Sequence, residues 1–349
     1  MRYNKVCVES FGYELPENIV TSLSLEERLA PVYSTLNLRY GRLEMMTGIR
    51  ERRFWNDGVT PSQASIRAAE KAISKSGVSR EDIGCLLYTS VSRDFLEPAT
   101  ATVVHDSLGL PHTATIFDIS NACLGFINGM VTLANMIELG QVKAGIVVGC
   151  ESSTRLIDST IDSVLKDPNI SREKLKLAFA TLTLGSGSVA AVLTHSSLGQ
   201  GGHKLLGGVT RAASQHNGLC RVEADTYFFD PRMLPEMRTS STQLLRNGSR
   251  LATNTWEATK QELGWSNSDV DSFFTHQVSA VQSKLFFKSL GLDKAKDFPT
   301  VEYLGNIASV SLPITMAIAI EQERLKSGDK VAMLGIGSGL VCLMLGLEW

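Results

Sequence analysis

A repeated sequence pattern is the feature that most constrains the fold of this chain of 349 residues. Residues 77–91 (GVSREDIGCLLYTSV) share the placement of Gly, Ser, Asp and a pair of large apolar residues with residues 264–278 (GWSNSDVDSFFTHQV), 187 positions later. Residues 143–148 and 330–335 match at the same spacing. Such self-similarity indicates a duplicated supersecondary unit, here present in two copies.

Each copy alternates helical stretches with short runs rich in Val, Ile, Leu and Phe, which are typical of strands buried between helices. The predicted strands are residues 86–91, 115–119, 146–148, 273–275 and 331–334. Residues 124–139 and 309–319 are apolar nearly all round, as expected of helices that lie between layers. We therefore predict an α/β fold with five layers, α/β/α/β/α, and these two helices in the middle.

The duplication predicts two halves that share one core, residues 1–177 and residues 178–349. Residues 158–176 and 196–243 are predicted to be insertions, either loop-rich or helical, because they match neither copy.

Composition excludes several classes of protein. There are 34 basic and 36 acidic residues, a formal net charge of −2, so the chain lacks the basic surface that nucleic-acid binding requires. No stretch reaches the ~18 unbroken apolar residues of a membrane helix. Residues 1–11 contain no uninterrupted apolar segment, so we expect no secretory signal. The six cysteines have irregular spacings that fit neither a disulfide scaffold nor a zinc site. We predict a cytoplasmic protein with free thiols, no metal and no membrane span.

Cys123 is the first candidate catalytic residue. It follows the predicted strand 115–119 and lies in the first turn of the predicted helix 124–139. The partial positive charge of a helix N-terminus favours a thiolate, so we expect a lowered thiol pKa and a nucleophilic sulfur. The alternative is a buried structural cysteine.

His276 and Asn306 are the next candidates, since both stand where an α/β fold presents reactive groups. His276 ends the predicted strand 273–275, where the first copy has Thr89. Asn306 precedes the second buried helix and aligns with Asn121. A hydrogen-bonded structural histidine and a helix N-cap are the alternatives. Both residues are expected to converge on Cys123.

A glycine-rich segment, residues 335–339 (GIGSG), is the last candidate. Its backbone N–H groups could hold a phosphate or a developing oxyanion, or the segment could be a tight turn.

At these residues the sequence resembles the thiolase superfamily, specifically the ketoacyl synthase III (FabH-like) branch. The motifs that carry the resemblance are residues 47–53 (TGIRERR), 122–126 (ACLGF), His276-Gln277, Gly305-Asn306 and the terminal glycine loop. The resemblance implies a thiolase-like fold whose first half carries the acylated nucleophile, Cys123. His276 and Asn306, from the second half, would hydrogen-bond the thioester oxygen of the second substrate. The backbone N–H groups of Cys123 and Ser338 would form another oxyanion hole.

Two departures from that branch point to a subgroup. The chain reads His276-Gln277-Val278-Ser279-Ala280 where carrier-protein-dependent synthases read His-Gln-Ala-Asn, and the first basic residue after it is Lys284. A carboxylate, Glu97, stands in a loop that usually carries an apolar residue. With residues 180–185 and 207–211, these features resemble the OleA group, the acyl-CoA condensing enzymes of long-chain olefin biosynthesis.

That resemblance implies a non-decarboxylative Claisen condensation of two long-chain acyl-CoAs, which yields a β-ketoacyl thioester and a β-keto acid. Without decarboxylation an α-proton must be removed. Glu97 is the expected base, reaching the neighbouring site of a homodimer, because an apolar channel raises the pKa of a carboxyl group.

The resemblance implies no cofactor beyond the CoA thioester substrates, and downstream enzymes of olefin biosynthesis as possible partners. Arg50, Arg52 and Arg53 are weak candidates for binding the CoA phosphates, with a solvated charge cluster as the alternative reading.

Three other functions stay open at this stage. One is a decarboxylative 3-oxoacyl-ACP synthase III that uses malonyl-ACP. Another is a Cys-His-Asn hydrolase of thioesters. The third, of a different class, is a non-catalytic acyl-binding subunit.

Overall fold

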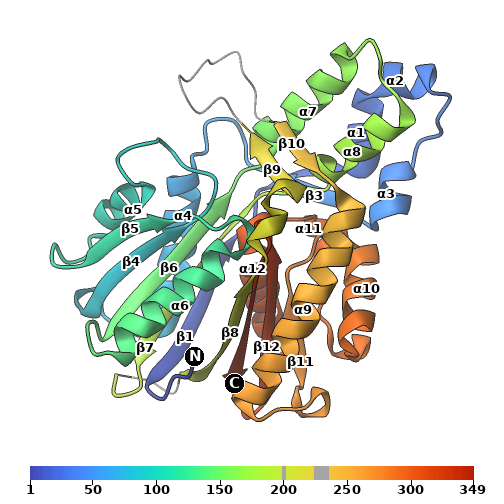
Figure 1. Ribbon diagram of the computed structural model, residues 1–349. Helices are drawn as coiled ribbons and strands as arrows, with labels where there is room; N and C mark the ends of the chain where they lie inside the picture. The colour runs from blue at the N-terminus through green and yellow to red at the C-terminus, as the bar shows by residue number, and fades with distance from the viewer. Residues whose placement is uncertain (199–201, 224–235) are drawn as a thin grey trace.

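The computed structural model describes residues 1–198, 202–223 and 236–349 (Figure 1). Nine strands form one mixed sheet in the order β11-β12-β13-β8-β1-β7-β6-β4-β5. The first-half strands are β1 (Val6–Glu14), β4 (Ile83–Thr89), β5 (Thr115–Ile119), β6 (Ala144–Glu151) and β7 (Gly187–His195). The second-half strands are β8 (His203–Ala212), β11 (Ser272–Thr275), β12 (Lys330–Gly337) and β13 (Val341–Glu348).

The two halves repeat one strand order and one set of directions. In the first half β4 is parallel to β6, β6 antiparallel to β7, and β7 antiparallel to β1. In the second half β11 is parallel to β12, β12 antiparallel to β13, and β13 antiparallel to β8. An antiparallel pairing of β1 with β8 joins them. The internal duplication predicted from the sequence is thus visible in the sheet.

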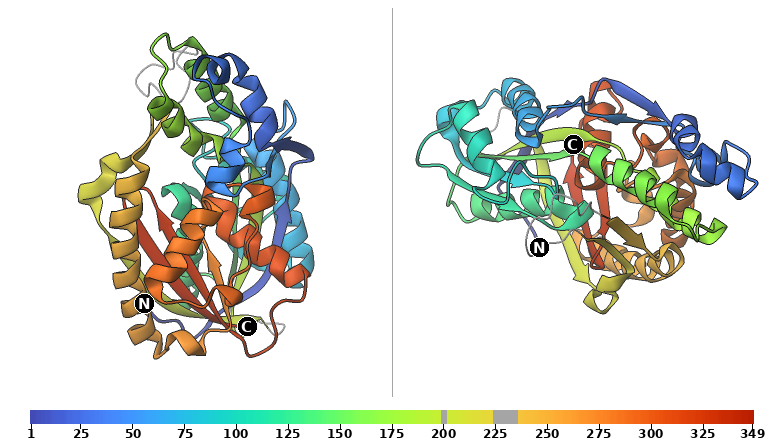
Figure 2. Two further views of the ribbon diagram at one scale, coloured as in Figure 1. Left: turned by 90° about the vertical axis from the view of Figure 1, so that its right-hand side faces the viewer. Right: turned by 90° about the horizontal axis from the view of Figure 1, so that it is seen from above.

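Helices cover both outer faces of the folded sheet and fill the space between the halves (Figures 1 and 2). The first outer layer is α4 (Pro61–Ser76) with α5 (Thr100–Leu108), and the second is α9 (Ser241–Leu263) with α10 (Ala280–Leu290). Between them lie α6 (Gly125–Glu138) and α12 (Ser311–Glu321). The five predicted layers are confirmed.

Alternation along the strands explains the layering, since successive side chains point to opposite faces. On β12, Val331 and Met333 pack into the central core with α6 and α12, whereas Ala332 and Leu334 pack against the outer helices. Nearly every residue of α12 is buried. A helix with that composition has no polar face and is stable only between two apolar surfaces.

Strand pairing places the change from the first to the second half after β7, because β7 lies between β6 and β1. The boundary expected at 177/178 falls inside α8 (Arg172–Leu182). Residues 196–243, expected to be an insertion, contain the core strand β8. Parts of that range, 199–201 and 224–235, lie outside the described residues.

A smaller group of helices gathers at one end of the molecule, at the top of Figure 1. It comprises α1 (Ser22–Arg28), α2 (Ala30–Thr35), α3 (Arg42–Thr47), α7 (Thr154–Lys166) and α8, which share an apolar cluster of their own. The short strands β2 (Asn18–Thr21) with β3 (Glu51–Phe54), and β9 (Cys220–Glu223) with β10 (Glu236–Thr239), form two small sheets.

Short helices complete the chain, of which α11 (Val301–Leu304) precedes Asn306. The 3₁₀ turns are η1 (Arg80–Asp82), η2 (Ala122–Leu124), η3 (Ser214–Leu219), η4 (Asn267–Asp269), η5 (Lys294–Lys296) and η6 (Ala308–Val310). In the described parts of the chain, no helix has the length and apolar character needed to cross a bilayer.

Candidate active site

A cavity of about 990 Å³ lies where the two halves and the small helical group meet, and most of its lining is apolar. Cys123, His276, Asn306 and the Gly337-Ser338 segment all line it. Met46 on α3, Leu177 on α8, and Leu244 with Leu245 on α9 line it as well. The structure thus brings the three residues predicted from the sequence to one cavity of the size that small-molecule sites have.

Cys123 lies in η2, immediately before α6. Ala122 adopts a positive φ of 45°, an uncommon conformation for a residue with a side chain, which turns the chain sharply from β5 into the helix. The backbone N–H groups of Cys123 and Ser338 lie near the sulfur and act to lower the pKa of the thiol. Two N–H donors therefore converge on the atom that would carry an acyl group.

The charge state of Cys123 differs from the expected thiolate. Burial, together with the nearby Cys220 and Glu151, raises the pKa of the thiol to about 12, although the two N–H groups act to lower it. Desolvation outweighs the effect of the helix N-terminus here, because the hydration free energy that a buried thiolate loses exceeds the stabilisation that two nearby N–H dipoles provide. The sulfur is protonated in the ligand-free protein.

His276 directly follows β11, and its backbone N–H donates to the Leu334 carbonyl at 3.1 Å, which continues the pairing with β12. Its Nδ1 is buried without a hydrogen-bond partner among the described residues. Burial lowers the pKa of His276 to about 4, so the imidazole is neutral. A neutral ring can donate one hydrogen bond and accept a proton at the other nitrogen.

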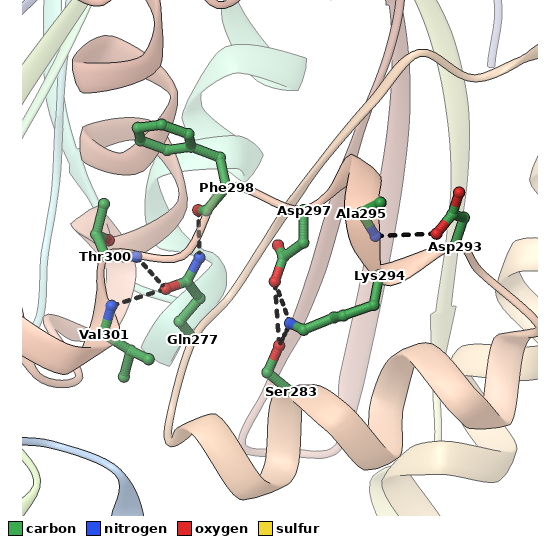
Figure 3. A network of polar contacts seen from close by, with 9 residues as sticks. All are labelled: Gln277, Ser283, Asp293, Lys294, Ala295, Asp297, Phe298, Thr300 and Val301. Carbon is green, nitrogen blue, oxygen red and sulfur yellow. Dashed lines mark hydrogen bonds and ion pairs between the residues drawn. The ribbon is translucent and has the colours of Figure 1, made fainter.

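The neighbouring Gln277 fixes the segment that carries His276 (Figure 3). Its Oε1 accepts from the backbone N–H groups of Thr300 and Val301, each at 2.9 Å, and its Nε2 donates to the Phe298 carbonyl at 2.9 Å. Val301 begins α11, so the buried amide caps that helix. Because α11 leads into Asn306, Gln277 links the His276 and Asn306 segments.

Asn306 is held by its backbone as well as its side chain. Its N–H donates to the Thr183 carbonyl, and its own carbonyl accepts from Gly185, both at 2.9 Å. Its Oδ1 accepts from the Ala308 N–H at 3.0 Å, which leaves the Nδ2 amide as the group available to a ligand. That orientation presents a hydrogen-bond donor, which an oxyanion requires.

The pairing of Asn306 with Asn121 was wrong by one position. Ala122 and Ala308 have the same φ of 45°, and each opens a 3₁₀ turn before a buried helix. The structural counterpart of Cys123 is therefore Ser309, in the turn η6. Two matching helix starts face each other, and only one carries a nucleophile.

Glu97 does not line the cavity that contains Cys123 in the same chain. It stands in the exposed loop 91–99 between β4 and α5, and its carboxylate is not among the cavity-lining groups. The loop is anchored at Asp94, which accepts from the Ser62 N–H at 2.9 Å. Within one protomer, the structure does not bring Glu97 to Cys123.

The three arginines expected to meet CoA phosphates do not line the cavity. Arg52 is fully buried and donates to Ser22 Oγ and the Leu182 carbonyl, both at 3.0 Å. Arg50 pairs with Glu302 at 3.2 Å, and Arg53 donates to the Pro16 carbonyl at 3.0 Å. The structure therefore does not bring these three side chains to the cavity, and a contact with the CoA phosphates stays a prediction.

Sequence reasoning missed the charged residues that do line the cavity, which are Arg155, Glu173, Lys176 and Glu151. Arg155 and Lys176 lie on α7 and α8, in the stretch 158–176 and its flanks that was treated as an insertion. Their spacing along two helices forms no recognisable motif. Among the described residues, no group of His, Cys, Asp and Glu is arranged to hold a metal ion.

Comparison with known families matches two regions. Residues 117–213 match the family model for 3-oxoacyl-[acyl-carrier-protein] synthase III, and residues 261–349 match the C-terminal model of the same family. A β-ketoacyl-[acyl-carrier-protein] synthase III of Bacillus pumilus is 30% identical over 97% of both chains. The chain belongs to this ketoacyl synthase III family of acyltransferases, whose thiolase-like fold the structure shows.

Within the family, stronger similarity extends over the full length of two relatives named acyl-CoA:acyl-CoA alkyltransferase. The protein of Shewanella oneidensis is 43% identical and that of Xanthomonas campestris 38% identical, each over 100% of both chains. Crystal structures of Xanthomonas campestris OleA agree in fold: a cysteine-to-serine variant with bound lauric acid and lauroyl-CoA has a TM-score of 0.92 at 38% identity, covering 99% of this chain and 100% of that one.

Proposed function

We propose that the protein condenses two long-chain acyl-CoA molecules, without decarboxylation, to a β-ketoacyl thioester and then a β-keto acid. The observation that carries the proposal is the convergence of Cys123, His276 and Asn306 on one largely apolar cavity. The full-length similarity to proteins named acyl-CoA:acyl-CoA alkyltransferase supports the acyl-CoA specificity.

The first step acylates Cys123. Because the resting thiol is protonated, its proton must leave as sulfur attacks the thioester carbonyl. The neutral imidazole of His276 lines the same cavity and is the base for this step. The proton passes to the departing CoA sulfur, so CoA leaves as a thiol and the acyl group remains on Cys123.

The second step forms the new carbon–carbon bond. A second acyl-CoA places its thioester oxygen against the Nδ2 amide of Asn306 and an N–H of His276, and its α-proton goes to the Glu97 carboxylate. The resulting carbanion attacks the acyl carbonyl on Cys123, whose oxygen is held by the N–H groups of Cys123 and Ser338. The bond between the acyl carbon and the Cys123 sulfur then breaks, and the proton that Glu97 took up passes to that sulfur. This restores the Cys123 thiol and the Glu97 carboxylate and releases a β-ketoacyl-CoA, which water hydrolyses to the β-keto acid and free CoA.

We further propose that Glu97 acts in the site of a second subunit. Strand β5 is the last strand of the sheet, so one of its edges is unpaired among the described strands. Phe117 on β5 and Leu96 in the neighbouring loop are exposed, Leu96 by 72%. A homodimer that pairs the two β5 edges would cover these apolar groups and carry loop 91–99 toward the other subunit.

The proposal also includes the cofactor requirement, CoA binding, the cellular location and the downstream partners. All the chemistry uses side chains and backbone groups of the chain, so no cofactor is required beyond the CoA thioesters. Arg155 and Lys176 line the cavity and are the groups that we propose for binding a CoA phosphate. A cytoplasmic location fits a CoA-dependent reaction and six free cysteines. The released β-keto acid would be passed to downstream enzymes of olefin biosynthesis.

One incubation separates the alternatives. The purified protein receives a single saturated acyl-CoA without malonate, and the products are analysed by mass. We expect a condensed ketone derived from two acyl chains. Condensation only on addition of malonyl thioester would indicate the decarboxylative synthase, free fatty acid alone would indicate a hydrolase, and absence of acylated Cys123 would indicate a binding subunit.

Mixed dimers test whether Glu97 acts across the subunit interface. Cys123→Ala and Glu97→Ala subunits should each be inactive alone, but a heterodimer of the two would contain one complete site. Random reassortment should restore about a quarter of wild-type condensation, since half of the dimers are mixed and each has one working site of two. If Glu97 serves its own subunit, the mixture stays as inactive as its parents.

A further inference from the structure

Glu151 is a buried carboxyl group that lines the same cavity as Cys123 and has no part in the proposed chemistry. It is the last residue of β6 and is only 2% exposed. Its two oxygens contact hydroxyl groups: Oε1 is in a short hydrogen bond with Ser309 Oγ, and Oε2 is 3.0 Å from Ser92 Oγ. In the described part of the chain, no Lys, Arg or His forms an ion pair with it.

The first contact reaches the second half of the fold. Ser309 is the structural counterpart of Cys123 and lies three residues after Asn306. Its hydroxyl also lies 3.3 Å from the Thr89 carbonyl oxygen at the end of β4. The Glu151 contact therefore fixes the turn that follows Asn306 against two strand ends of the first half.

The second contact reaches the loop that carries Glu97. Ser92 is near the start of loop 91–99, and its hydroxyl accepts from the Ser152 N–H at 3.0 Å. Its carbonyl accepts from the Tyr88 hydroxyl at 2.5 Å. Of the side chains that hold the root of the loop, Glu151 is the one that also contacts the segment around Asn306.

Burial acts against the charged form of the Glu151 carboxyl group. Burial raises the pKa of Glu151, although the serine hydroxyls act to lower it. A protonated carboxyl can donate to one hydroxyl and accept from another, whereas a buried carboxylate without a cation is costly. The Ser309 hydroxyl can then accept a hydrogen bond from the protonated acid while it donates one to the Thr89 carbonyl.

We propose that Glu151 is a positioning residue that holds, with one carboxyl group, the Asn306 turn beside Cys123 and the root of the loop that bears Glu97. The inference rests on the proposed function, because both segments matter together only in the condensation step. Acylation of Cys123 uses neither the Asn306 amide nor Glu97.

The test compares Glu151→Gln with Glu151→Ala. Glutamine keeps the shape, one donor and one acceptor, so condensation should stay within about threefold of wild type, whereas alanine should lower the kcat of condensation by about tenfold or more. Both variants should acylate Cys123 at the wild-type rate, measured as the mass shift of the intact protein with acyl-CoA.

Serine variants give an independent reading if Glu151→Ala does not fold. Ser92→Ala and Ser309→Ala each remove one of the two contacts and should each lower condensation without slowing acylation. Ser65→Ala is the matched control, because Ser65 is fully buried, lies outside the cavity lining and has no hydrogen-bond partner among the described residues. It should leave both rates unchanged.

Three outcomes would overturn the inference. Wild-type condensation by Glu151→Ala or by both serine variants would show that the contacts are dispensable. Loss of condensation in Glu151→Gln equal to that in Glu151→Ala would show that the carboxylate itself reacts. Equal loss of acylation and condensation would indicate a general packing defect. The wild-type protein distinguishes these outcomes from failure of the proposed function. If the proposed function is wrong, the wild-type protein itself forms no condensed ketone.

Discussion

The starts of the two buried central helices, α6 and α12, have the same backbone conformation but different roles. In the first half, Ala122 at φ 45° leads into Cys123, which lines the cavity and has backbone N–H groups near its sulfur. In the second half, Ala308 at the same φ leads into Ser309, whose hydroxyl is tied to Glu151 and the Thr89 carbonyl. The same turn therefore occurs in both halves, but only in the first half is the side chain that follows it, Cys123, available to react.

The strand ends show the same division. Thr89, where the first copy ends β4, uses its hydroxyl to reach the Val148 carbonyl at 3.2 Å. His276, at the end of β11, keeps Nδ1 without a partner among the described residues. An unsatisfied buried polar atom is costly unless a ligand pairs with it. The half with the satisfied strand end supplies the nucleophile, and the half with the unsatisfied one supplies the side-chain donors, His276 and Asn306.

The sharpest test of this comparison exchanges the two helix-start residues for alanine. Cys123→Ala should abolish acylation, because no other group attacks the thioester at that position. Ser309→Ala should be acylated like wild type, since the hydrogen-bond partners of its hydroxyl among the described residues are Glu151 and the Thr89 carbonyl. Intact-protein mass after exposure to acyl-CoA measures both. Acylation that survives Cys123→Ala would place the nucleophile elsewhere, with Cys220 the first residue to examine.

A smaller loss is expected from the residues of the second half that donate hydrogen bonds. Asn306→Ala removes one oxyanion donor and should lower condensation by about 10²–10³-fold, the usual cost of such a group. Acylation of Cys123 should persist, because the N–H groups of Cys123 and Ser338 are unchanged. Single-turnover measurements of CoA release and ketone formation separate the two steps. A parallel loss of both would assign Asn306 to the acylation step as well.

Much of the fold was predictable because strong patterns specify it. The repeat at 187 positions and the two helices without a polar face are enough to require two halves around a buried pair of helices. Strand β8 was missed because Gly207, Gly208 and charged residues interrupt its apolar pattern. The glycines are needed there: a Cβ on Gly207, which has a φ of 118°, would lie 2.2 Å from the Met1 carbonyl oxygen.

The candidate site was predictable only in part, and for a physical reason. Cys123, His276 and Asn306 each sit at the end of an element, where sequence pattern and topology place them together. The charge state of Cys123 depends on how much water the folded cavity excludes, which no local motif records. Glu151 ends an ordinary apolar strand, and its contact with Ser309 joins residues 158 positions apart. Long-range contacts of this kind leave no trace in a single sequence.

The smallest expected effect is on stability, and it follows from the low pKa of His276. In the unfolded chain a histidine takes up a proton as pH falls through about 6.5, whereas the folded protein keeps His276 neutral down to about 4. The unfolded state therefore binds more protons in that window, so acid destabilises the fold by up to about 1.4 kcal/mol per pH unit through this group.

A His276→Gln variant lacks this titrating group. The difference between its free energy of unfolding and that of wild type should therefore shift in favour of the variant as pH falls from 6.5 toward 4. Denaturant unfolding at several pH values measures the difference, with Asn306→Ala as a cavity variant whose difference from wild type stays constant with pH. A difference between His276→Gln and wild type that is flat across the window would mean that the imidazole is not desolvated. The contrast between a strand end left unsatisfied for a ligand and one satisfied within the sheet would then fail at its central residue.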